Sequence, residues 1–265
     1  MNVGALIIGD EILSGRRADK HLARTIELLT ARGMQLSWAR YVGDDPERIT
    51  RELREAFASG DLVFSFGGIG ATPDDHTRAC AAQALQRPLV LHPQARELIL
   101  QRVRETAAEK GEPFDADHPD TVRRLDMGRF PEGASIVPNP YNRIPGFSVG
   151  SVYFVPGFPV MAWPMVEWAL DTHCAHLHRQ RPWAERALIV LGTMEATLTP
   201  LMVDIEARFP GIKVFSLPSV DHPQWGRHIE LGVKGEPEQV NQAFAWLTAA
   251  LHRDGVPTGP EVGVQ

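Results

Sequence analysis

Apolar residues in the first part of the chain alternate between short continuous runs and helical spacing. Continuous runs such as 3–8 and 62–66 are typical of strands buried on both faces of a sheet. Between them, Leu22, Ile26 and Leu29 recur at intervals that place them on one face of a helix. The pattern predicts strands at 3–8, 36–42 and 62–66 and helices at 17–32, 46–59 and 75–85.

This β-α-β-α-β-α order is typical of an open, mostly parallel sheet with helices on both faces, which is a three-layer α/β fold. The chain after residue 85 continues the mixture of helices and strands. Helices are expected at 94–109, 120–128 and 161–173, and strands at 134–137 and 152–155. We therefore predict one large α/β domain over residues 1–175.

A polar tract at 172–183 predicts a boundary, and a smaller module follows it. Beyond the tract, the order strand, helix, two strands, helix is typical of a small α+β module. Its strands are expected at 184–191, 212–217 and 228–233, and its helices at 196–209 and 237–252. We predict this module over 184–253 and, because of its Gly and Pro content, a flexible tail over 254–265.

The composition is that of a globular protein, with 43% hydrophobic and 23% charged residues. The formal net charge of −6 and the lack of a basic run argue against nucleic-acid binding. Two cysteines, Cys80 and Cys174, cannot form a disulfide framework. The N-terminus lacks a basic signal-peptide segment, and prolines interrupt the apolar stretch 151–170. We expect a cytoplasmic protein with neither a membrane nor a nucleic-acid partner.

Acidic residues occur in pairs after the first three predicted strands. The pairs are Asp10-Glu11, Asp44-Asp45 and Asp74-Asp75. Because the carboxyl ends of parallel strands share one edge of a sheet, we expect all three pairs on one rim. Helix capping is the open alternative: Asp45 can cap the next helix, and Thr72, Pro73 and Asp75 fit a capping box.

A glycine-rich stretch, 66–72, joins the third strand to the third helix. Its three glycines allow a sharp turn and a close approach of a ligand to backbone amides, which suits phosphate. The stretch matches neither GxxxxGK nor GxGxxG, and a plain tight turn is the alternative. Since carboxylates repel phosphate, we hypothesise a divalent cation between the acidic pairs and this loop.

The stretches 8–16 (IGDEILSGR) and 67–77 (GGIGATPDDHT) resemble the competence/damage-inducible protein A family. Its N-terminal domain is the molybdopterin-binding domain also found in proteins of the MoaB/Mog type. Later turns at 139–140, 145–146 and 156–159 follow in the same order as in that family. The resemblance covers about residues 1–172, and a weaker one to the small module that follows covers 184–252.

The resemblance implies a nucleotide or pterin phosphate as ligand. It further implies a divalent-metal-dependent pyrophosphatase (Mg, Mn or Co) that acts on ADP-ribose- or FAD-like substrates and releases AMP. The alternatives are a molybdopterin or nucleotide binder without turnover and a Mog-like molybdopterin adenylyltransferase of molybdenum cofactor biosynthesis. A homo-oligomer, either a dimer or a trimer, is implied as well. Longer family members carry an additional amidase domain, whose activity is not expected of this chain.

The resemblance also implies roles for individual residues, with Asp44 and Asp75 as the catalytic and metal-binding residues. The expected ligand-binding residues are Gly9, Asp10, Glu11, Gly15, Gly67, Gly68, Gly70, Thr72, Asp74, Thr77, Asn139, Pro145 and Gly146. Four positions depart from the family pattern, namely His21 for Asn, Ala71 for Pro, Asn142 for Gly and Ile144 for Ala. The last two changes are expected to narrow the pocket wall and to influence which substrate fits.

Overall fold

The computed structural model describes residues 1–179 and 183–263. It divides into two compact units, Met1–His178 and Arg179–Gln265. Residues 180–182 of the predicted boundary tract and residues 264–265 of the predicted tail lie outside the described residues. Each unit is described by itself below.

Unit 1 is built on a six-stranded, mostly parallel sheet with the order β2-β1-β3-β8-β7-β6. The first four strands in this order run parallel, and β7 and β6 complete the sheet in antiparallel pairing. The strands are β1 (Val3–Ile8), β2 (Trp38–Val42), β3 (Leu62–Phe66), β6 (Ser135–Val137), β7 (Gly146–Val149) and β8 (Val152–Val155). The predicted α/β fold class is confirmed.

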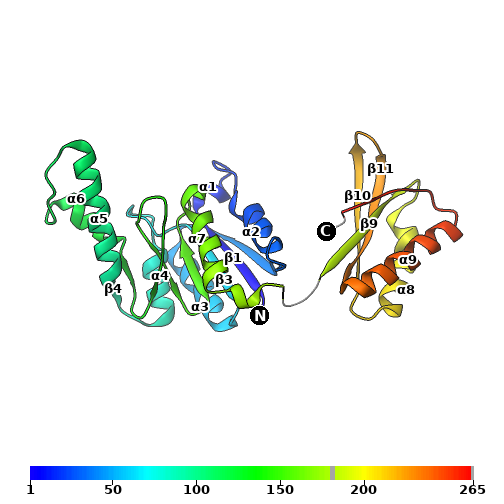
Figure 1. Cartoon of the computed structure of the whole chain (residues 1–265), viewed down its shortest axis with the longest axis horizontal. Coiled ribbons are helices and arrows are strands. Elements are labelled where there is room, and N and C mark those ends of the chain that lie inside the picture. The colour runs from blue at the N-terminus through cyan, green and yellow to red at the C-terminus, as the bar shows by residue number, and fades with distance from the viewer. Residues whose placement is uncertain (180–182, 264–265) are drawn as a thin grey trace. The chain divides into compact units, whose positions relative to one another are not determined.

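Helices cover both faces of this sheet, because side chains alternate between the faces along each strand. From β1, Val3, Ala5 and Ile7 join a core with α2 and α7, while Leu6 and Ile8 join a separate core with α3 and α4. The helices are α2 (His21–Thr30), α3 (Pro46–Ser59), α4 (Thr77–Leu85) and α7 (Pro159–Thr172). Two apolar cores on opposite faces fix the three layers (Figure 1).

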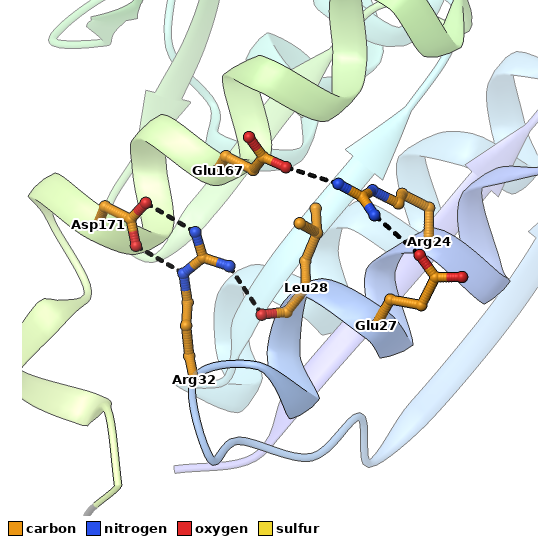
Figure 2. A network of polar contacts seen from close by, with 6 residues as sticks. All are labelled: Arg24, Glu27, Leu28, Arg32, Glu167 and Asp171. Atoms are coloured by element: carbon orange, nitrogen blue, oxygen red, sulfur yellow. Dashed lines mark hydrogen bonds and ion pairs between the residues drawn. The ribbon is translucent and has the colours of Figure 1, made fainter.

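Ion pairs join α2 and the turn that follows it to α7 on the outer surface of unit 1 (Figure 2). The Arg32 guanidinium donates to both oxygens of Asp171, at 2.5 and 2.7 Å, and also to the carbonyl of Leu28. Arg24 donates to Glu167 at 2.8 Å. Arg24, Glu167 and Asp171 are all more than a third exposed, and only Arg32 is mostly buried, so each pair adds modestly, about 0.2–1 kcal/mol, to the packing of the two helices.

The segment between α4 and β6 forms an arm. It consists of β4 (Leu89–Leu91), α5 (Pro93–Lys110), α6 (Pro119–Asp126) and β5 (Arg129–Pro131), with β4 and β5 paired antiparallel. Only Ala95, Ile99 and Leu100 of α5 are buried, so most of the helix extends away from the sheet (Figure 1).

Unit 2 is a four-stranded antiparallel sheet with the order β10-β11-β9-β12, packed against two helices. Its elements are β9 (Ala184–Leu191), α8 (Glu195–Arg208), β10 (Lys213–His222), β11 (Gly226–Gly235), α9 (Pro237–Arg253) and β12 (Thr258–Val262). The prediction of a flexible tail over 254–265 is wrong for 258–262. This segment pairs with β9, and its Glu261 binds Arg186 at 2.6 Å.

Several other boundaries differ from the predicted ones. The first long helix begins at His21 rather than Arg17, because Asp19 accepts the backbone N–H groups of His21 and Leu22 and ends the preceding loop. A four-residue helix, α1 (Asp10–Leu13), precedes it. Among the described residues, no helix has the length and apolar character needed to cross a membrane.

Candidate functional site

A pocket of about 390 Å³ opens at the carboxyl edge of the sheet in unit 1. Residues that directly follow four parallel strands line it: Gly9 after β1, Asp44 beyond β2, Gly67 after β3 and Pro156 after β8. Because parallel strands end at one edge, the topology alone brings these distant segments together. The expectation of a ligand site at this edge agrees with the position of the pocket.

The glycine-rich loop after β3 forms one wall of the pocket. Gly67 has a φ of +96°, and a Cβ there would lie 2.3 Å from the carbonyl oxygen of Ile8. At Gly70, a Cβ would lie 2.6 Å from the Asp75 carboxylate. Gly67 therefore requires glycine, and a Cβ at Gly70 would displace the Asp75 carboxylate.

Asp75 holds this loop in shape. Its carboxylate accepts the backbone N–H of Gly70 at 2.9 Å, the N–H of Thr72 at 2.8 Å and the Thr72 hydroxyl at 2.5 Å. The predicted capping box is wrong, because α4 begins only at Thr77 and neither Thr72 nor Asp75 caps it. The hydrogen bonds within the loop take its place.

Arg78 supports the loop from behind, a role that the sequence analysis missed. Its guanidinium donates to the carbonyl of Gly70 at 2.5 Å and also to the carbonyl of Asp126 at the end of α6. Burial lowers the pKa of Arg78, and the nearby charge of Asp75 opposes that shift. The loop is therefore tied both to α4 and to the base of the arm.

Asp44 lies on the other side of the pocket and is linked to Asp10. The backbone N–H of Asp10 donates to Oδ2 of Asp44 at 2.9 Å, and the N–H of Asp44 donates to Oδ1 of Asp10 at 3.2 Å. Burial raises the pKa of Asp44, and the negative charges of Asp10, Glu11 and Asp74 raise it further, against the effect of the Asp10 hydrogen bond. Negative charge is thus concentrated here.

The other members of the acidic pairs divide between the pocket and structural roles. Glu11 and Asp74 line the pocket together with Asp44 and Asp75. Asp45 instead caps α3, where it accepts the backbone N–H of Arg48 at 2.7 Å. Capping therefore applies to Asp45, whereas Glu11, Asp44, Asp74 and Asp75 lie on the pocket.

The remaining predicted ligand-binding residues also fall into two groups. The ones that line the pocket are Gly9, Gly67, Gly68, Gly70, Thr72, Asn139 and Pro145. Four of the predicted residues lie outside the lining: Asp10, Gly15, Thr77 and Gly146. Thr77 is buried directly behind Gly68 and donates its backbone N–H to the Gly68 carbonyl at 3.0 Å. It supports the loop from below.

Asn139 organises the opposite wall, the loop 139–144. Its buried side chain donates to Oδ1 of Asn142 at 2.8 Å and to the carbonyl of Ile144 at 3.0 Å, and it accepts the backbone N–H of Tyr141. Asn142 and Ile144, two of the departures from the family pattern, line the pocket. Their side chains occupy space at the wall, as the sequence predicts.

His21 supports a third wall from inside the core. It stacks on Phe66 with ring centroids 4.5 Å apart, and its Nε2 lies 3.1 Å from the carbonyl of Gly157, a lining residue. Its Nδ1 is buried without a partner among the described residues. Burial lowers the pKa of His21 below its ordinary value of 6.5, so the ring is neutral at pH 7 and Nε2–H donates to Gly157.

Sequence reasoning missed several apolar lining residues. Met127, Phe158 and Met161 line the pocket from α6, the β8–α7 turn and α7. No polar or glycine pattern distinguishes them from ordinary core residues. Arg17 also lines the pocket and adds positive charge to a largely acidic wall.

Within residues 1–179 and 183–263, no group of three or more His, Cys, Asp or Glu side chains is arranged to hold a metal ion. The donor chemistry nevertheless suits a hard divalent cation, because Glu11, Asp44 and Asp74 are carboxylates on one pocket. Burial does most to raise the pKa of Asp44, and the charges of Asp10, Glu11 and Asp74 add to that shift; a bound cation would offset this repulsion.

The fold and the pocket together define a class: a three-layer α/β domain with a pocket at the carboxyl edge of its sheet. Comparison with known proteins then identifies the family. The model of the family described as "Probable molybdopterin binding domain" matches residues 4–176, and the chain belongs to that family.

Individual relatives place the chain among the CinA-like proteins, as the sequence motifs predict. A protein of Pyrobaculum calidifontis is 31% identical over 231 residues, which cover 84% of each chain. A CinA-like protein of Syntrophotalea carbinolica is 32% identical over 74% of this chain and 46% of its own length. The chain spans about half the length of the CinA-like relatives it matches.

A solved structure agrees with the fold of unit 1. The crystal structure of CinA from Thermoplasma acidophilum, a protein of unknown function, is 28% identical and superimposes with a TM-score of 0.54. The superposition covers 65% of the present chain and 98% of the Thermoplasma acidophilum chain.

Proposed function

We propose that this protein is a divalent-cation-dependent pyrophosphatase that cleaves ADP-ribose- or FAD-like dinucleotides and releases AMP. One observation carries the proposal: a glycine-rich amide loop and the carboxylates Glu11, Asp44 and Asp74 line the same pocket of about 390 Å³. The loop offers hydrogen-bond donors to phosphate, and the carboxylates offer oxygen ligands to a cation.

In this proposal each wall has its own task. The N–H groups of Gly67, Gly70 and Thr72 already donate to Val155 and Asp75. The loop 67–72, kept in shape by Asp75, therefore binds phosphate oxygens through the backbone N–H groups of Gly68, Ile69 and Ala71. Asp44 and its acidic neighbours would hold the cation, which would supply positive charge to the phosphates and a lowered pKa to the attacking water. Asp44 accepts a hydrogen bond at Oδ2 only, so its other oxygen is available to the ligand, as judged from the described residues.

The reaction is a hydrolysis at phosphorus. Water adds to one phosphorus while the bridging P–O bond breaks. The products are AMP and a second monophosphate, ribose 5-phosphate from ADP-ribose or FMN from FAD. No oxidant or further reactant is required, and the proton that the water loses is taken up by a base in the pocket or by solvent.

A direct assay tests the proposal. The protein is incubated with ADP-ribose or FAD in Mg²⁺, Mn²⁺, Co²⁺ or EDTA, and AMP is quantified by chromatography. AMP released with a cation and not with EDTA supports the proposal, whereas no AMP with any of the three cations contradicts it.

A second candidate, binding of molybdopterin or a nucleotide without turnover, is favoured by the loop 139–144. Asn142 and Ile144 narrow the pocket where the family has Gly and Ala, and so they exclude water or misplace a substrate in this alternative. Calorimetric binding of AMP without hydrolysis of ADP-ribose or FAD supports this candidate. Transfer of AMP from ATP to molybdopterin would instead indicate the Mog-like adenylyltransferase.

A further inference from the structure

A second cavity of about 530 Å³ lies beside the candidate site, between α5, α7 and the loop 139–144. Leu98 of α5, Pro138 before the loop, and Pro164 and Trp168 of α7 contribute apolar walls. All of these residues belong to unit 1, so the cavity depends on one compact body.

The loop 139–144 separates the two cavities. Asn142 and Ile144 line the first cavity, whereas Tyr141 and Arg143 line the second, and Asn139 lines both. Successive residues of this loop therefore face different cavities, and the loop 139–144 forms a partition between them. The buried Asn139 side chain fixes the partition through its three hydrogen bonds.

The second cavity has aromatic side chains in its wall and an arginine whose charge is neutralised by a glutamate. Tyr141 is 63% exposed, and Trp168 is half-buried. Arg143 is held by a 3.2 Å ion pair with Glu105 of α5, and its backbone is in the left-handed region with a φ of +64°. The ion pair leaves little net charge, so the cavity favours a flat, neutral ring over a second phosphate.

Size makes a second cavity necessary for a dinucleotide. The first cavity, about 390 Å³, is near the lower end of the 300–1,000 Å³ typical of sites for drug-sized ligands. A dinucleotide carries two ribosyl or ribityl halves on its two phosphates. If one half and the phosphates occupy the first cavity, the other half must extend beyond it.

We propose that the second cavity binds the ring at the far end of the substrate, stacked against Tyr141 and Trp168. This inference rests on the proposed function and narrows its substrate class. The protein then prefers pyrophosphates with an aromatic ring at both ends, such as FAD, over ADP-ribose, whose far end is a bare sugar.

The test compares the ratio of kcat/KM for FAD to kcat/KM for ADP-ribose in the full chain. Base stacking on an aromatic side chain contributes enough that Tyr141→Ala or Trp168→Ala is expected to lower this ratio about tenfold. Trp168→Phe keeps a ring and is expected to retain most of the preference. Phe114→Ala, an aromatic truncation on the arm outside both cavities, is the matched control and is expected to leave the ratio unchanged.

A binding measurement separates this inference from the proposed function. With Ca²⁺ as the cation, calorimetric Kd values for FAD and AMP are compared in the wild type and the Tyr141→Ala variant. The inference is supported if the wild type binds FAD more tightly than AMP and if Tyr141→Ala removes this difference in affinity. This holds even if no substrate is hydrolysed. Equal loss of FAD and AMP affinity, no FAD binding by the wild type, or an unchanged kcat/KM ratio in both alanine variants would overturn the inference.

Discussion

Two carboxylates on one pocket, Asp44 and Asp75, differ in how they are held. Asp75 accepts three hydrogen bonds from its own loop, whereas Asp44 accepts a single one, from the N–H of Asp10. The expected metal role of Asp75 stays a prediction, but its contacts give it a positioning role. We therefore expect substitutions at the two residues to separate stability from activity.

Asp75→Ala leaves the N–H groups of Gly70 and Thr72 without their acceptor. We expect a loss of about 1–2 kcal/mol, or a few °C in Tm, together with weaker ligand binding. Asp44→Asn keeps an acceptor for Asp10 and removes a charge that the fold disfavours, as its raised pKa shows. Its Tm should stay equal or rise. Calorimetry measures both variants, and a larger Tm loss for Asp44→Asn would contradict these assignments.

His21 predicts a pH dependence of stability. Its folded pKa lies below the unfolded value of 6.5, so the unfolded chain binds more protons between the two values. Its contribution is complete above pH 6.5 and is lost as the pH falls towards the lowered pKa, by at most about 1.4 kcal/mol per pH unit.

The comparison for this prediction is His21→Asn, which removes the titrating ring. The wild type should exceed the variant in free energy of unfolding at pH 8, because the variant loses the stacking on Phe66. That difference should shrink between pH 6.5 and pH 5 in urea titrations. A difference that stays constant over this range would refute the role of the buried ring.

At the scale of elements, two turns differ in how strongly they require glycine. Replacing Gly67, in the turn after β3, should destabilise the fold more than replacing Gly15, in the turn after α1. Gly67→Ala brings a Cβ against the Ile8 carbonyl in addition to the cost of a positive φ, so we expect a loss above about 2 kcal/mol. Gly15 also has a positive φ of +72°, but a Cβ there meets nothing within 4 Å, so Gly15→Ala should cost only about 1 kcal/mol. Urea unfolding measures both variants, and equal losses would contradict this account of the turn.

Elements with a strong local pattern could be predicted from the sequence. The bounds of β1, β3 and β8 agree with their continuous apolar runs, and α3 begins and ends where Asp45 and Gly60 indicate. The missed elements are short, namely α1, β4, β5, β7 and β12. Strands of three to five residues depend on pairing with distant partners, which no local pattern records.

The candidate site divides in the same way. The glycine loop and four of the six acidic residues, namely Glu11, Asp44, Asp74 and Asp75, carry chemistry that is visible in the sequence, and they do line the pocket. Met127 and Phe158 line it only because the topology brings α6 and the β8–α7 turn to the same edge. The partition at 139–144 was visible as a motif, but its two faces follow from the side-chain hydrogen bonds of Asn139.

At the scale of the whole molecule, both cavities belong to unit 1, and unit 2 contains its own core. We therefore expect changes in unit 2 to leave ligand affinity intact. Deleting residues 258–265 removes β12 from the sheet and should lower the Tm of unit 2 by several °C in calorimetry. Glu261→Gln loses only a partly exposed ion pair with Arg186 and should cost less than about 1 kcal/mol.

The deletion would count against this division if it lowered the affinity of the protein for AMP as strongly as it lowered the Tm of unit 2. An unchanged Tm would show instead that the pairing of β12 with β9 adds nothing to the stability of unit 2.

Hydrolysis in the pocket is expected to depend on a divalent cation and on Asp44. The most direct measurement is the rate of AMP release from FAD with Mn²⁺ and with EDTA, by the wild type and by Asp44→Asn. We predict release only with the cation. In the variant, the rate should fall at least about 100-fold. Equal rates for the two proteins, or no AMP from the wild type, would contradict the account.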